Sequence, residues 1–171
     1  MGTEPERSPD GRFVIVDGRR WRASDPSIPD ALRAELVAEL MAARREVGAA
    51  AGDAERTAAA RRRVQDAKVA LGERGEPWWE PTSGSGRAAR LRAAMLSLLR
   101  ARDPEKTICP SDAARVVGGP SWRPAMPAAR DVAAALADDG LLEVRQRGRP
   151  VDVRAARGPV RIARGHGWPR D

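Results

Sequence analysis

Few residues of this sequence could carry catalytic or metal chemistry. The chain has one cysteine, Cys109, and one histidine, His166, far apart along the sequence. Because zinc sites need several Cys or His ligands at short spacing, we expect no metal site and no cofactor. The sequence has no phosphate-binding glycine loop, no Gly-x-Ser-x-Gly motif and no acidic pair near a histidine. We therefore expect a protein that is not an enzyme.

Cys109 stands directly before Pro110, and proline favours the first position of a helix. This order places Cys109 at the N-cap, where Ser, Thr, Asp or Asn would cap better. A cysteine at this position favours a buried, structural role. The alternative is a reactive thiol whose pKa is lowered at the helix N-terminus.

Arginine is the abundant chemical group, and its distribution is uneven. Residues 1–86 contain 14 Lys and Arg against 15 Asp and Glu, whereas residues 87–171 contain 17 against 9. Arginine binds phosphate through charge and paired hydrogen bonds. The second half is therefore expected to meet a polyanion. The alternative is an arginine-rich face that is merely solvated.

The first half reads as a small mixed unit over residues 13–79, after a polar tail at 1–12 that we expect to be disordered. "FVIVDGRRWRA" predicts a β-hairpin, because Asp-Gly suits a two-residue turn. Apolar spacing then predicts helices over 29–47 and 54–71. This unit buries little surface, so it is a candidate for dimerisation or partner binding.

Two tryptophans end that unit, just before a Gly- and Ser-containing linker at 80–87. Exposed tryptophans are frequent in binding hot spots, so Trp78 and Trp79 are candidate partner-binding residues. The alternative is that both pack onto the small core.

The second half predicts helix, short strand, helix, turn, helix, strand, basic loop and strand over residues 88–164, with a tail at 165–171. This is the element order of a winged helix-turn-helix. The predicted class is therefore α+β, with an N-terminal β-hairpin plus helical hairpin and a C-terminal winged helix-turn-helix. The two halves are expected to form two small cores.

Winged helices place the third helix in the major groove of DNA and the wing on its backbone or in its minor groove. Arg147 and Arg149 are expected to contact phosphates from the wing, and Arg130 to lie nearer to base edges, with a structural role as its alternative. The candidate nucleic-acid-binding residues are Arg123, Arg130, Arg145, Arg147 and Arg149.

Three segments, "KTICPSDAARVV", "WRPAMPAARDVAAALADDGLLEVRQRGRPVD" and "RGPVRI", resemble the bacterial domain of unknown function 3253 family, a winged-helix-like module. The resemblance implies the fold and brings no characterised activity. In the first half, "DGRRWRASDPSIPDALRAELVAELMAARREV" and "VQDAKVALGERGEPWW" resemble small bacterial proteins labelled as Tol-type biopolymer transporters. That label is hard to reconcile with a chain in which no segment could cross a membrane.

Duplex DNA binding is the leading hypothesis, with the first half mediating dimerisation or contact with a protein partner. A protein-interaction or structural adaptor is the alternative, because fold does not determine function. RNA binding, a regulatory subunit and an enzyme stay open behind these two. The sequence has no leader segment and no long apolar run, so we expect a cytoplasmic protein with no membrane contact.

Overall fold

The N-terminal strands form around a tight turn. The computed structural model describes residues 5–169. Its first three strands, β1 (Glu6–Arg7), β2 (Phe13–Val16) and β3 (Arg19–Arg22), make an antiparallel sheet in that order. Asp17 and Gly18 have φ values of 50° and 72°, the positive values that the predicted Asp-Gly turn requires. The predicted hairpin is confirmed.

β1 lies within the segment that the sequence predicts as a disordered tail. Glu6 pairs with Ile15 and Arg7 with Val14, so β1 extends the hairpin to three strands. The chain reverses between them through a turn in which the Gly11 amide donates to the Ser8 carbonyl. The prediction is corrected for this strand, because the edge of β2 offers backbone partners that composition does not reveal. Residues 1–4 of that tail lie outside the described residues.

Three helices follow and form the centre of the fold. They are α1 (Asp30–Ala49), α2 (Ala54–Ala70) and α3 (Gly84–Ala101). α1 and α2 lie within about two residues of their predicted bounds, the usual uncertainty of helix ends. α3 begins inside the predicted linker at 80–87, because Ser83 caps it by accepting from the Gly86 amide at 2.9 Å.

The remaining elements form a second mixed layer. α4 (Pro110–Gly118) is followed by two short 3₁₀ turns, η1 (Gly119–Ser121) and η2 (Arg123–Ala125), and by α5 (Met126–Asp138). The strands β4 (Leu142–Gln146), β5 (Arg149–Pro150) and β6 (Arg161–Arg164) make a sheet in the order β5-β4-β6. Ile108 bridges to Ile162 at the free side of β6. The fold is therefore mixed, with helices and small antiparallel sheets, compatible with the predicted α+β class.

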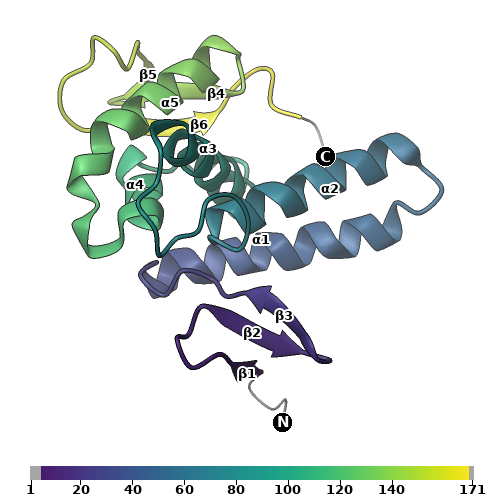
Figure 1. The fold of residues 1–171 in the computed structure, drawn as a ribbon. Coiled ribbons are helices and arrows are strands. Elements are labelled where there is room, and N and C mark those ends of the chain that lie inside the picture. The colour runs from purple at the N-terminus through teal and green to yellow at the C-terminus, as the bar shows by residue number, and fades with distance from the viewer. Residues whose placement is uncertain (1–4, 170–171) are drawn as a thin grey trace.

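One hydrophobic core joins the two halves, where the sequence predicts two. Helix α3 contacts α1, α2, α4 and α5. Its residues 90–99 are buried, with the exception of Arg92, which is exposed. Figure 1 shows the N-terminal sheet beside α1 at one side of this helical layer and the second sheet at the other. Ala93 and Ala94 are buried in α3, and their small side chains permit close packing of the surrounding helices.

The predicted C-terminal tail is also held in place over its described part. The amides of Gly165 and Gly167 donate to the carbonyls of Leu141 and Gly140 at 2.8 and 2.9 Å. Trp168 packs against the core. These contacts hold the described part of the predicted tail against the core, while positions 170 and 171 lie outside the described residues.

Candidate nucleic-acid interface

A tight turn between β4 and β5 presents the two arginines that the sequence assigns to the wing. Arg147 and Gly148 have φ values of 51° and 78°, and Gln146 pairs with Arg149 across the turn. Both arginines are exposed, and neither makes an ion pair with a carboxylate among residues 5–169. The turn therefore presents two unneutralised cations to solvent.

Arg145 is less available. It is half-buried, and its Nε donates to Glu143 Oε1 at 2.5 Å. A carboxylate at this distance offsets most of the charge that a phosphate would meet. Arg145 is therefore a weaker candidate than Arg147 and Arg149.

Arg123 lies in η2, immediately before α5, and is exposed. Its guanidinium is 4.9 Å from the ring centroid of Trp122, and the Arg115 guanidinium is 4.8 Å from the same centroid. The indole thus lies close to two cations from different elements. This pair of arginines is a second basic feature, at the N-terminal end of α5.

Arg130 serves the fold. Its Nη2 donates to the carbonyls of Val153, at 2.9 Å, and Ala156, and its Nη1 is 3.4 Å from the carbonyl of Gly158. These bonds use the guanidinium to hold the loop between β5 and β6 against α5. That Arg130 lies nearer to base edges stays a prediction, and its alternative, a structural role, is the one that this geometry favours.

The exposed side of α5 is acidic. Asp131, Ala135 and Asp138 recur at helical spacing and all three are exposed. Arg154 Nη2 lies 2.5 Å from Asp138 Oδ2, and this hydrogen bond lowers the pKa of Asp138 below its ordinary value. Asp138 is therefore largely neutralised, whereas Asp131 makes no ion pair among residues 5–169 and repels phosphates, which argues against deep insertion of α5 into a DNA groove.

Trp78 and Trp79 pack within the molecule. Trp78 Nε1 donates to the Ala23 carbonyl at 2.9 Å, and the two indoles meet edge to face with centroids 5.2 Å apart. Trp79 in turn meets the Phe13 ring edge to face at 5.5 Å. Both tryptophans are half-buried and join the N-terminal sheet to the helices. This geometry favours the packing alternative over an exposed docking pair.

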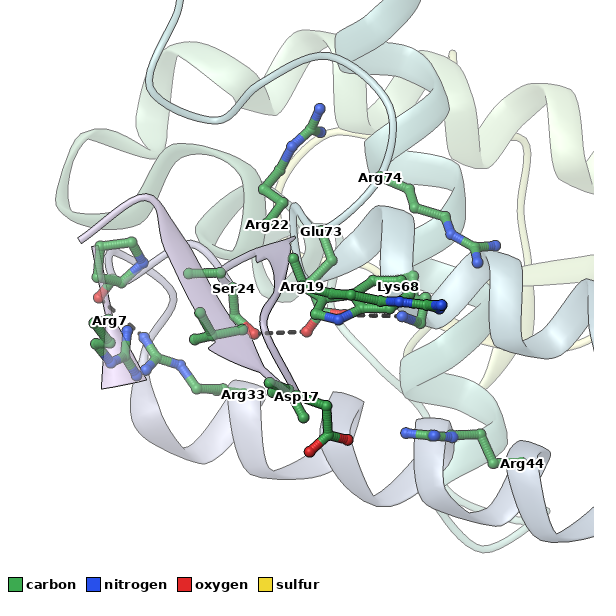
Figure 2. Close-up of a pocket in the computed structure, with 15 residues that line it drawn as sticks. Arg7, Asp17, Arg19, Arg22, Ser24, Arg33, Arg44, Lys68, Glu73 and Arg74 are labelled. Carbon is green, nitrogen blue, oxygen red and sulfur yellow. Dashed lines mark hydrogen bonds and ion pairs between the residues drawn. The ribbon is translucent and has the colours of Figure 1, made fainter. Parts of the chain in front are cut away.

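A basic cleft in the first half was missed by the sequence reasoning. It is lined by one face of the N-terminal sheet, by α1 and by the end of α2, and has a volume of about 890 Å³ (Figure 2). Because residues 1–86 have a net charge near zero, their composition gives no indication of a basic cleft. The available signal was the alternation along β3, which places Arg19 and Trp21 on the face opposite to Arg20, although Arg22 at the end of the strand also lines the cleft.

The lone cysteine and histidine occupy separate places. Cys109 is half-buried at the N-cap of α4, as its position before Pro110 predicts, and its amide donates to Asp112 Oδ2 at 2.9 Å. His166 is exposed and lies against Gly140. Within the described part of the chain, no group of three or more His, Cys, Asp or Glu side chains could hold a metal ion.

Comparison with known proteins gives one family match. Residues 88–165 match the model of a family described as protein of unknown function (DUF3253). This agrees with the resemblance noted for the second half. No curated protein matches the chain. The match leaves out the first half, so the similarity of that half to Tol-labelled proteins stays an expectation. No helix within residues 5–169 has the length and apolarity needed to cross a membrane.

Proposed function

We propose that the second half is a winged-helix module that binds duplex DNA through its phosphates, in a cytoplasmic bacterial protein that is not an enzyme. The observation that carries the proposal is the turn between β4 and β5, where Arg147 and Arg149 are exposed and unpaired within residues 5–169. Free arginines on a protruding turn suit phosphate contact. The pairing of Ile108 with Ile162 beside β6 and β4 adds support, because a winged helix has a short strand at this place.

The surface of α5 limits the mode of binding. Its exposed carboxylate Asp131, which makes no ion pair among residues 5–169, opposes close approach to DNA, and Arg130 is engaged with the loop. Arg123, in η2 just before α5, is the candidate that can still reach DNA from this end of the helix. We therefore expect phosphate contact from the turn and little discrimination between base sequences.

The second candidate is a protein-interaction adaptor, and the acidic side of α5 is the observation that favours it. In that function the turn arginines and the α5 carboxylates form a mixed surface for a protein partner. If the second half is an adaptor, the protein should show no binding to random duplex DNA even at low salt.

A salt titration of random duplex binding, followed by fluorescence anisotropy, tests the proposal. The Arg147→Ala/Arg149→Ala variant should flatten the slope of log K against log salt by about 1.8, because each lost phosphate contact removes about 0.9. The matched control is Arg61→Ala/Arg62→Ala, which removes two arginines exposed on α2. An unchanged slope in the turn variant would remove the turn from the mechanism.

The role of Arg130 is tested separately. Arg130→Met should increase hydrogen exchange in the loop at residues 151–158, because the three carbonyl contacts are lost. Its effect on DNA affinity should be the same for every base sequence. Relaxed preference for a selected site, with unchanged exchange in the loop, would restore Arg130 to a role in base reading.

A further inference from the structure

The cleft beside the N-terminal sheet, which we call the sheet cleft, has a strongly positive lining. Its titratable acidic residues are Asp17 and Glu73. Glu73 is already engaged, since it accepts from Ser24 Oγ at 2.8 Å and lies 3.6 Å from Lys68 Nζ. Figure 2 shows the basic side chains arranged around Glu73. The basic residues that line the cleft are Arg7, Arg19, Arg22, Arg33, Arg44, Lys68 and Arg74.

Three of these cations are available to a ligand. Arg7, Arg19 and Arg44 are exposed, and none of them makes an ion pair or side-chain hydrogen bond with another residue of the described range 5–169. By contrast, Arg33 donates to three backbone carbonyls and Arg22 to the Gly75 carbonyl. The cleft therefore has a fixed frame and a set of free positive charges.

The sheet presents an aromatic ring among these charges. Arg7 pairs with Val14, and Val14 pairs with Trp21, so the three side chains lie in a row on one face of the sheet. Trp21 keeps 49% of its surface exposed, and Lys68 Nζ is 5.9 Å from its ring centroid. Arg20 lies on the opposite face, over Phe13. An exposed indole beside unpaired arginines combines stacking with charge.

Helix α1 continues this surface. Arg33, Val37, Met41 and Arg44 follow one another at spacings of three and four residues, which places them on one side of the helix. Val37 and Met41, together with Val16 and Trp21, are the large apolar side chains that residues 5–169 leave exposed. Arg33 and Arg44 are separated by about 16 Å along the helix axis, at 1.5 Å per residue.

We propose that the sheet cleft binds single-stranded nucleic acid, with a base stacked on Trp21 and phosphates on Arg19 and Arg44. Grooves that bind single strands combine positive charge along the backbone path with aromatic rings for the bases. A base can stack on Trp21 only if it is unstacked from a neighbouring base, and the bases inside a duplex are stacked on both sides. The cleft extends about 16 Å along α1, from Arg33 of its frame to the free Arg44, and this length exceeds one phosphate group and suits several successive nucleotides.

The shape of the site disfavours one other anionic surface. A bilayer is flat on this scale and meets protruding residues, whereas these cations line a hollow. An acidic protein segment could meet the charges and the apolar residues, but it would make no particular use of an indole ring. This proposal is independent of duplex binding by the second half, because the two surfaces share no residue.

The test uses the full chain and a labelled single strand of about twelve thymidines, followed by fluorescence anisotropy over a range of salt. Arg19→Ala/Arg44→Ala should weaken binding roughly tenfold and flatten the salt slope by about 1.4, at 0.7 per contact on a single strand. The matched control is Arg20→Ala/Arg45→Ala. It removes the same charge from neighbouring positions on the same two elements, and neither residue lines the cleft.

The ring is tested by Trp21→Leu, which keeps an apolar side chain and should weaken binding about tenfold through lost stacking. The Arg147→Ala/Arg149→Ala variant should bind the single strand as the parent does, so failure at the turn and failure at the cleft are distinguishable. Melting temperatures of all variants exclude unfolding as the cause of a loss.

Several outcomes would overturn the proposal. Equal losses of affinity in Arg19→Ala/Arg44→Ala and Arg20→Ala/Arg45→Ala would show that positive charge attracts the strand without a defined binding site. Unchanged affinity in Trp21→Leu would remove the stacking contact. Competition by polyglutamate as effective as that by the unlabelled strand would assign the cleft to an acidic protein segment. Competition by thymidine monophosphate at the same nucleotide concentration would assign it to a free nucleotide.

Discussion

The buried ion pair between Asp25 and Arg90 should be one of the most sensitive polar contacts of this fold. Arg90, on α3, is 7% exposed, and Asp25, before α1, is 4% exposed. Arg90 Nη2 donates to Asp25 Oδ2 at 2.9 Å and lies 3.3 Å from the Val116 carbonyl, and its Nε donates to the Ala70 carbonyl. One guanidinium thus links four segments from both halves of the chain.

Arg90→Met is expected to lower the free energy of unfolding by about 3–5 kcal/mol. It leaves the Asp25 carboxylate buried without its counter-charge, and such uncompensated buried charges cost this much. The carbonyls of Ala70 and Val116 also lose a donor. For a chain of this size the melting temperature should fall by roughly 6–20 °C. Arg92→Met is the matched control, because Arg92 is exposed and 3.9 Å from its partner, so its loss should cost less than about 1 kcal/mol.

Urea denaturation followed by tryptophan fluorescence measures both changes, with an unchanged m value as the criterion for a simple loss of stability. The ion pair also predicts that the effect of Asp25→Asn on the free energy of unfolding has opposite signs in the parent and in the Arg90→Met variant. Asp25→Asn should destabilise the parent but stabilise the Arg90→Met variant, because it removes the stranded charge. A loss below about 1 kcal/mol in Arg90→Met, or further destabilisation by Asp25→Asn in that background, would refute the reasoning.

Two further predictions concern backbone and pH. Gly119→Ala should lower the free energy of unfolding, measured by urea denaturation, by roughly 2–4 kcal/mol, because Gly119 has a φ of 53° and an added Cβ would lie 2.8 Å from Ser27 Cβ. Gly148→Ala is the control. It has open space around it and should lower the free energy of unfolding only by the roughly 1–2 kcal/mol of a positive φ. Glu76 accepts from the Ser83 hydroxyl and amide, which lowers the pKa of Glu76, so Glu76→Ala should destabilise the protein at neutral pH. That difference should disappear as the pH falls from about 4.3, the value in the unfolded chain, through the lower folded pKa, and a difference that persists in acid would contradict it.

Local features were predictable where neighbouring residues decide them. Asp17-Gly18 requires positive φ and produces the hairpin, and Pro110 places Cys109 at the start of α4. The apolar spacing of α1 and α2 sets those helices within about two residues. The sequence predicts a linker at Gly84, but a cap from Ser83, supported by Glu76, starts a helix there in spite of a composition typical of a linker.

The candidate site likewise contains residues whose placement local sequence predicts and one whose contacts only folding decides. The exposure of Arg147 and Arg149 follows from a basic tight turn, which local sequence predicts. The role of Arg130 depends on a loop more than twenty residues away in the chain, whose carbonyls the guanidinium reaches only after folding. The family match over residues 88–165 agrees with the sequence resemblance.

The sequence by itself determined the helices, the hairpin turn and the excess of arginine in the second half, because these depend on residue type and short spacing. Only the tertiary structure decided that both halves share one core, since α3 is covered by helices from each side of the chain. Only the structure, too, gathered Arg7, Arg19 and Arg44 into the sheet cleft, although residues 1–86 are nearly neutral in sum. Net charge counts residues along the chain, whereas a ligand meets the charges that folding brings to one surface.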